Sequence, residues 1–214
     1  MTIGRIMTHN PITVKPDTPV TDAQALMRRE KIHRMPVLDR SNKLAGMVSE
    51  KDLLYASPSP ATTLNVYEMS SLLAKLKIEK VMTKKVITAQ EDTLVEDAAR
   101  TMVDNNIGGL PVMRGETLIG IVTESDIFKL FIELFGVRKK GIRASLLVPE
   151  KRGELAGMTS AIAARGGNII SVGTFPGDDA THGILLIKVE DLSKDGFMDA
   201  VKPFVKNVLD IREV

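Results

Sequence analysis

The hydrophobic and polar positions follow the same order twice along the first two thirds of the chain. In each copy a short β-branched segment, at residues 12–14 and 86–88, is followed by apolar residues at helical spacing. An apolar strand after Pro36 or Pro111, a polar turn, another apolar strand and a closing helix complete the pattern. These periodicities predict two units with the order β-α-β-β-α.

The two units are an internal duplication. Met7-Thr8 matches Met82-Thr83 at a spacing of 75, and after a one-residue deletion Gly46 matches Gly120 at a spacing of 74. A register kept over such a length is not chance, and the unit is longer than a solenoid repeat. We therefore expect two globular halves, residues 1–57 and 78–136, that pack as a pseudo-twofold pair.

A linker at residues 58–77 separates the halves. Pro58 and Pro60 end the first closing helix, because proline lacks an N–H and disfavours helix before it. Residues 64–76 regain helical spacing and predict a helix that covers apolar surface. The lysines from Lys75 to Lys85 indicate a solvated face, with a nucleic-acid site as the weaker alternative.

The last part of the chain, residues 141–214, predicts a separate domain. Strands are expected at 142–148, 168–175, 184–189 and 208–211, and helices at 153–165 and 194–205. The order β-α-β-β-α-β is the ferredoxin-like one, so the whole chain is of the mixed α+β class. A sheet of this kind with an open edge often pairs with a neighbour, which predicts a homodimer.

Composition narrows the function classes. A net charge of +2 argues against a dedicated nucleic-acid binder. The absence of cysteine removes disulfides, thiolate metal sites and cysteine nucleophiles, and it fits a reducing interior. The N-terminus lacks the apolar core of a signal peptide, and no apolar run reaches the ~18 residues of a membrane span. We expect a soluble cytoplasmic protein that is not an enzyme, since it has no nucleophile elbow, P-loop or metal-spaced cluster.

Each half ends in a hydroxyl and a carboxylate three residues apart, Ser49 with Asp52 and Thr123 with Asp126. The hydroxyl lies where a strand turns into a helix, a position that favours a phosphate. The carboxylate can accept hydrogen bonds from both hydroxyls of a ribose. The pair therefore indicates a nucleoside-phosphate site, although a capping box explains either copy alone equally well.

Residues Gly46–Asp52 and Gly120–Asp126, each preceded by an apolar-Pro-Val step, resemble the CBS domain, and the tandem resembles a Bateman module. The resemblance covers residues 1–135. It implies a non-catalytic sensor that binds AMP, ADP, ATP or S-adenosylmethionine in the clefts between the repeats, with NAD(H) as a further candidate. No catalytic cofactor or metal is implied.

The resemblance implies two unequal clefts. In the first, Ser49 and Asp52 would hold ribose and phosphate with help from His33 and Arg34, and adenine would pack on Ile87, Thr88, Leu110 and Pro111. The second would use Thr123 and Asp126, with adenine on Ile12, Thr13, Met35 and Pro36. Gly108-Gly109 replaces the His-Arg pair there, so a nucleoside-like ligand or none is expected.

The last domain resembles the ACT domain, on Lys151–Leu155 and Gly166–Ile169. The resemblance implies an amino-acid effector site at Gly153, Glu154, Leu155, Asn168 and Ile169. Arg152 replaces the usual proline, so a purely dimerising role is an equal alternative. His182 with Asp178-Asp179 indicates a polar hairpin turn rather than a metal site, which needs three or four converging ligands.

A CBS pair followed by an ACT-like tail resembles the acetoin-utilisation AcuB-like proteins. The resemblance implies a regulatory role in carbon metabolism, through a regulated metabolic enzyme. The alternatives are a DNA-associated regulator and an accessory subunit of such an enzyme.

Overall fold

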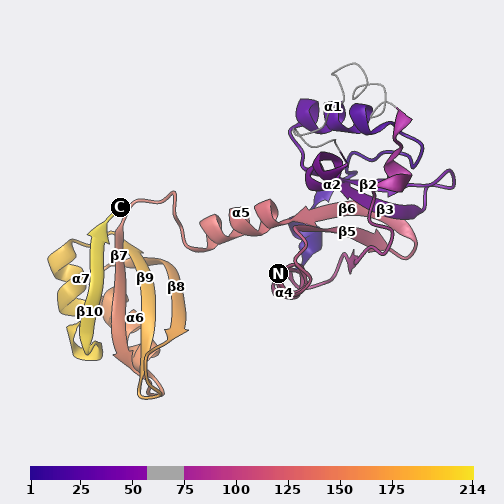
Figure 1. The fold of residues 1–214 in the computed structure, drawn as a ribbon. Helices are drawn as coiled ribbons and strands as arrows, with labels where there is room; N and C mark the ends of the chain where they lie inside the picture. The colour runs from indigo at the N-terminus through magenta and orange to yellow at the C-terminus, as the bar shows by residue number, and fades with distance from the viewer. Residues whose placement is uncertain (57–74) are drawn as a thin grey trace. The chain divides into compact units, whose positions relative to one another are not determined.

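The computed structural model describes residues 1–56 and 75–214, which fall into two compact units, Met1–Ile127 and Phe128–Val214 (Figure 1). The helix predicted within residues 58–77 lies almost entirely outside the described residues. Helix α5 (Glu124–Leu134) begins in the first unit and ends in the second.

The first unit contains the two repeats, except for the end of α5. The first repeat has β1 (Thr8–His9), α1 (Val20–Glu30), β2 (Arg34–Leu38), β3 (Leu44–Ser49) and α2 (Glu50–Tyr55). The second has β4 (Ala89–Gln90), α4 (Val95–Asp104), β5 (Gly109–Arg114), β6 (Thr117–Thr123) and α5. Short 3-10 helices, η1 (Ile3–Arg5) and η2 (Ile78–Lys80), lie at equivalent positions at the start of the two repeats. The predicted succession of helices and paired strands is confirmed.

The first strand of each repeat is displaced from its predicted position. Residues 12–14 form only an isolated bridge, from Val14 to Val37, and residues 86–88 form no ladder. The ladders lie instead at β1 and at β4. The prediction was wrong because a β-branched run marks extended backbone, and extended backbone without a neighbouring strand makes no ladder.

The repeats exchange their opening segments. In the first unit β1 pairs antiparallel with β6 of the second repeat, with Thr8 opposite Ile121. Thr83, the equivalent of Thr8, makes the matching bridge to Met47 in β3 of the first repeat. Each Met-Thr segment therefore extends the sheet of the other repeat, in accord with a pseudo-twofold relation between them.

Apolar residues from the predicted periodic positions form the core of the first repeat. Val20, Ala23 and Met27 on one face of α1 pack with Val37 and Val48 from the sheet. Ile78, from the start of the second repeat, is fully buried in the same cluster. The exchanged segments are thus part of the hydrophobic core as well as of the sheets.

The second unit has the predicted β-α-β-β-α-β order. Its elements are β7 (Ile142–Pro149), α6 (Glu154–Ala164), β8 (Asn168–Pro176), β9 (His182–Glu190), α7 (Lys194–Val201), η3 (Lys202–Phe204) and β10 (Asn207–Glu213). The antiparallel sheet has the order β10-β7-β9-β8, which is the ferredoxin-like arrangement. The helix predicted to reach residue 205 ends at Val201, because Pro203 favours a tighter turn.

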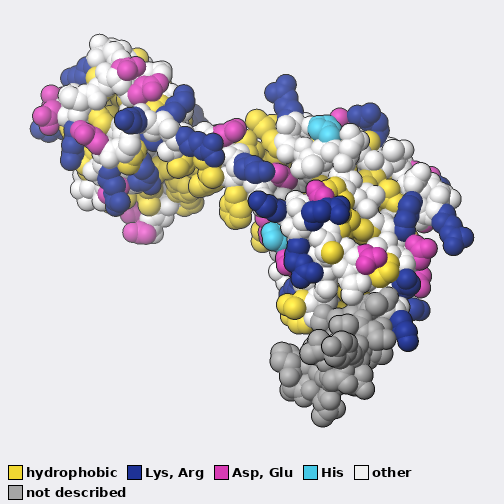
Figure 2. Space-filling view, turned by 90° about the horizontal axis from the view of Figure 1, so that it is seen from above, with side chains coloured by type: hydrophobic (Ala, Val, Ile, Leu, Met, Phe, Trp, Pro, Cys, Tyr) yellow, Lys and Arg dark blue, Asp and Glu magenta, His cyan; other side chains and the backbone are white. Residues whose placement is uncertain are grey.

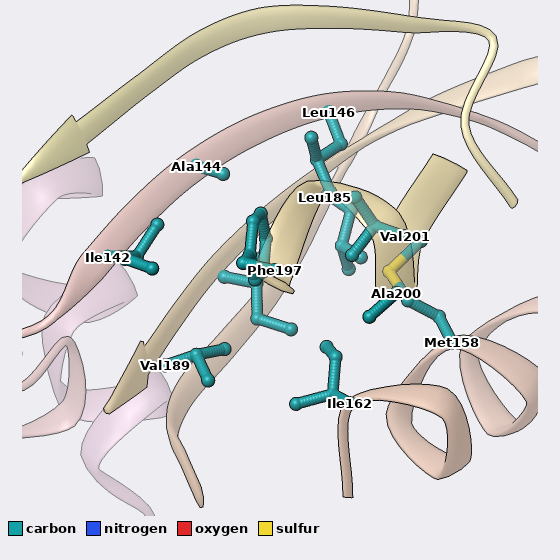
Figure 3. Packing of buried hydrophobic residues seen from close by; sticks show 11 residues of the cluster. Ile142, Ala144, Leu146, Met158, Ile162, Leu185, Val189, Phe197, Ala200 and Val201 are labelled. Atoms are coloured by element: carbon teal, nitrogen blue, oxygen red, sulfur yellow. The ribbon is translucent and has the colours of Figure 1, made fainter. Parts of the chain in front are cut away.

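Helices α6 and α7 cover one face of this sheet, as Figure 1 shows. Figure 3 shows the core between these helices and the sheet. In it Phe197 from α7 and Ile162 from α6 point toward alternate residues of the strands. Alternation puts Ile142, Ala144 and Leu146 of β7 on this face, because successive strand residues point to opposite sides. The apolar alternation in the sequence therefore identifies the buried face correctly.

Candidate ligand-binding cleft

A cavity of about 540 Å³ lies between the two repeats. The first repeat contributes the start of β2, the end of β3 and most of α2, and the second contributes residues 83, 85–87 and 106–109. Pockets for small molecules and cofactors usually enclose about 300–1,000 Å³. The cavity is therefore large enough for a nucleotide-sized ligand.

Five of the eight residues predicted for the first cleft line this cavity: His33, Arg34, Ser49, Asp52 and Ile87. The other three do not line it. Thr88 is exposed next to it, whereas Leu110 and Pro111 are buried in β5. The structure thus brings together the predicted polar residues of the first repeat and one apolar residue of the second.

Ser49 and Asp52 form a capping box at the start of α2. The Ser49 N–H and Oγ donate to Oδ2 of Asp52 at 2.8 and 2.7 Å, and the Asp52 N–H donates to Ser49 Oγ at 3.2 Å. A serine at this position satisfies N–H groups that the first helical turn leaves unpaired. Both hydrogen bonds that the Asp52 carboxylate accepts end on Oδ2, so Oδ1 has no partner among the described residues. The capping role and a ligand contact through Oδ1 are compatible.

His33 and Arg34 are adjacent in sequence but have different partners. Nδ1 of His33 lies 2.7 Å from Oε2 of Glu50, the first residue of α2, and both side chains are exposed. The half-buried Arg34 side chain extends to the second repeat, where it packs against Gly108 and Gly109. Burial lowers the pKa of Arg34, and the negative charge of Glu124 opposes this shift.

The cavity is also lined by two lysines that were not predicted to belong to this site, Lys51 from α2 and Lys85 from the second repeat. Lys51 Nζ lies 5.7 Å from the ring centre of Tyr55, which also lines the cavity. In the sequence both lysines fall in ordinary charged stretches that indicate a solvated face. Knowledge of which backbone segments surround the cleft would have been needed to identify them.

The second motif has the same hydrogen bonds in a more buried setting. The Thr123 N–H and Oγ1 donate to Oδ2 of Asp126 at 2.9 and 2.8 Å, and Asp126 is only 7% exposed. Of the residues predicted for adenine there, Met35 and Pro36 are buried, Thr13 is half-buried and Ile12 is exposed. None of these six residues lines the 540 Å³ cavity.

The residues predicted for an effector site in the second unit form two separate groups. Gly153 has a left-handed φ of 87° just before α6, and Glu154 and Leu155 begin that helix. Asn168 and Ile169 begin β8, after the other end of α6. Eleven helical residues span about 16 Å, so one chain does not bring the two groups together.

The polar hairpin predicted around His182 is confirmed. The Thr181 N–H and Oγ1 both donate to Oδ1 of Asp179, and His182 Nδ1 lies 3.3 Å from the same oxygen. The Thr181 bonds, with His182, lower the pKa of Asp179 to about 2. Within residues 1–56 and 75–214, no group of three or more histidine and acidic side chains could hold a metal ion.

Charges of both signs are interspersed on the face seen in Figure 2, which shows no continuous basic surface there. This agrees with the net charge of +2. None of the helices in the described part of the chain has both the length and the apolar character needed to span a membrane.

Comparison with known proteins identifies relatives of the two repeats. The family model of the CBS domain matches residues 3–59 and 78–133. The uncharacterized protein MJ1426 of Methanocaldococcus jannaschii is 38% identical in an alignment of 145 residues, with coverages of 57% of this chain and 86% of the relative.

Three solved structures, each 30% identical, have similar folds. The CBS domain pair of protein MJ0100, in complex with 5′-methylthioadenosine and S-adenosyl-L-methionine, has a TM-score of 0.52 and covers 65% of this chain and 98% of its own. The structure of CBSX2 in complex with AMP has a TM-score of 0.51, with coverages of 64% and 98%. A candidate acetoin utilization protein (AcuB) from Vibrio cholerae has a TM-score of 0.53, with coverages of 64% and 95%.

Proposed function

Because the chain belongs to the CBS domain family, we propose that it is a non-catalytic regulatory protein that binds an adenine nucleotide or an adenosyl ligand between its repeats. The observation that carries this proposal is the cavity in which Asp52 and the basic residues of the first repeat face a segment of the second. The adenosyl ligands and AMP present in two structures of similar fold support the same ligand class.

The lining supplies the chemistry that such a ligand needs. Oδ1 of Asp52 would accept hydrogen bonds from ribose hydroxyls, because its carboxylate uses Oδ2 for the capping box. Val86 and Ile87 offer apolar surface for the adenine. Arg34, Lys51 and Lys85 supply positive charge for phosphate, and the planar guanidinium of Arg34 suits two phosphate oxygens at once.

Isothermal titration calorimetry with AMP, ADP, ATP, NADH and S-adenosylmethionine tests this proposal on the full chain. We expect at least one of them to bind, and Asp52→Asn to weaken binding by about tenfold or more through loss of charge-assisted hydrogen bonds. Asparagine keeps a side-chain oxygen for the capping box, so α2 should remain folded. Asp22→Ala, an exposed residue early in α1 that does not line the cavity, is the control.

The proposal fails if none of these compounds releases heat or raises the melting temperature of the folded protein. It also fails if Asp52→Asn and Asp22→Ala bind equally well. Turnover of a bound nucleotide would show that the protein is an enzyme rather than a sensor.

The second unit would transmit or complete the signal, either by dimerisation through its sheet or by binding a small effector. The similarity to the candidate acetoin utilization protein supports a regulated metabolic enzyme as the partner. Light scattering coupled to gel filtration measures the mass of the full chain, and a monomer at all concentrations would exclude the homodimer. The net charge of only +2 favours these roles over a DNA-associated one.

A further inference from the structure

Glu50 and Glu124 occupy equivalent positions in the two repeats. Each is the first residue of the closing helix of its repeat. Each donates its backbone N–H to the carbonyl of the residue just before β2 or β5, Glu50 to His33 at 2.8 Å and Glu124 to Gly108 at 3.2 Å. Glu50 pairs with the imidazole of His33. Because glycine stands at position 108, Glu124 has no such side chain in its own repeat.

Arg34 of the first repeat fills the space that the glycines leave. A Cβ on Gly108 would overlap Nη2 of Arg34 and would lie 2.7 Å from Oε2 of Glu124. A Cβ on Gly109 would lie 2.9 Å from Nη1 and 3.0 Å from Cδ of Arg34. Any larger residue at these two positions would displace the guanidinium, so the missing side chains of Gly108 and Gly109 leave the space that it occupies.

The ends of the Arg34 and Glu124 side chains both lie beside Gly108, and the carboxylate acts on the guanidinium electrostatically. No hydrogen bond or ion pair within 4.0 Å joins the two side chains in the described part of the chain. Arg34 also lines the cavity, whereas Glu124 does not. The guanidinium therefore lies near the exposed carboxylate of Glu124 and also borders the space available to a ligand.

Building on the proposed function, we propose that Glu124 is a specificity-determining residue, which holds Arg34 in the empty cleft and competes for it with the phosphate of a ligand. A phosphate monoester carries more negative charge than a carboxylate and presents three acceptor oxygens. Such a ligand attracts Arg34 away from Glu124. The lost attraction between Arg34 and Glu124 offsets part of the affinity that the phosphate adds. A ligand without a phosphate leaves the pair intact.

Calorimetry with AMP and adenosine on the full chain tests this competition, because the two probes differ only in the phosphate. Glu124→Gln should tighten AMP binding by about two- to fivefold, the range of a weak surface ion pair, and leave adenosine unchanged. Arg34→Gln should weaken AMP by about tenfold or more, since it removes charge-assisted hydrogen bonds. In the Arg34→Gln background, Glu124→Gln should have no effect on AMP, because Glu124 acts only through Arg34.

Three outcomes would overturn this inference while the proposed function stands: Glu124→Gln leaves AMP binding unchanged, weakens it, or tightens AMP and adenosine equally. Binding of neither probe nor of any other adenosyl compound would instead remove the proposed function, and this inference with it. Glu124→Asp, which keeps the charge, should restore wild-type discrimination between AMP and adenosine. A purely structural role of Glu124 would change the melting temperature but not that discrimination.

Discussion

The glycine of each Gly-apolar-Val motif should be required for packing between the repeats rather than for ligand contact. A Cβ on Gly46 would lie 2.7 Å from Sδ of Met82 and 2.9 Å from the carbonyl oxygen of Thr83. A Cβ on Gly120 would lie 2.5 Å from Sδ of Met7 and 3.1 Å from the carbonyl oxygen of Thr8. We therefore expect Gly46→Ala and Gly120→Ala to destabilise the first unit.

The structure sets the size of this effect. The Thr83 carbonyl cannot move freely, because it accepts a hydrogen bond from the Met47 N–H at 2.9 Å and the Thr83 N–H donates to the Met47 carbonyl at 2.8 Å. Overpacking of this kind costs about 1–3 kcal/mol. The reduced freedom of the unfolded chain with alanine offsets about 0.4–1 kcal/mol. A net loss of about 1–2 kcal/mol is expected for each variant.

Urea unfolding followed by tyrosine fluorescence measures this loss in the first unit alone. The chain has no tryptophan, and its two tyrosines, Tyr55 and Tyr67, both precede residue 128. Gly108→Ala is the matched control, since its Cβ would meet only the ends of two flexible side chains, and it should change stability by less than about 0.5 kcal/mol. The reasoning is refuted if Gly46→Ala and Gly120→Ala are as stable as the wild type, or if Gly108→Ala is the least stable of the three.

Three further predictions concern the second unit. Phe197→Ala should cost about 3–5 kcal/mol because Phe197 is fully buried, and calorimetry should show a lower transition while the tyrosine midpoint stays constant. Lys188→Met should cost about 1–3 kcal/mol in circular-dichroism melts, because it removes the bonds that Nζ donates to the carbonyls of Gly136 and Lys139; an unchanged melt would contradict this. NMR titration should give Asp179 a pKa of about 2 and Thr181→Ala a clearly higher one. Because the folded-state pKa is depressed, Asp179 stabilises the fold above the pKa of the unfolded chain and loses this effect as the pH falls toward 2.

The sequence was sufficient for features that depend on a repeated or periodic pattern. The register between the copies identified the paired halves, and the alternation in β7 identified the buried face of the second unit. Ser49 and Asp52 were predictable because their role at the start of α2 is local, within three residues. Such contacts need no knowledge of the tertiary structure.

Features that depend on contacts between the repeats were not predictable from the sequence. Residues 86–88 were assigned to a strand, whereas the structure places Val86 and Ile87 in the cavity wall. Lys85 gained its position there because the segment from Thr83 crosses to the first repeat. No local pattern specifies that exchange, since a Met-Thr pair has no distinctive periodicity.

The two predicted clefts differ at the glycine pair at positions 108 and 109, which stands where the first repeat has His33 and Arg34. Glycine there removes the cation of the second repeat and, at the same place, makes room for Arg34 of the first. The glycine pair thus leaves Arg34 as a cation at the 540 Å³ cavity and places its guanidinium near Glu124. Because Glu124 is the first residue of α5, which continues into the second unit, a phosphate that takes Arg34 away changes the charge environment at the start of that helix.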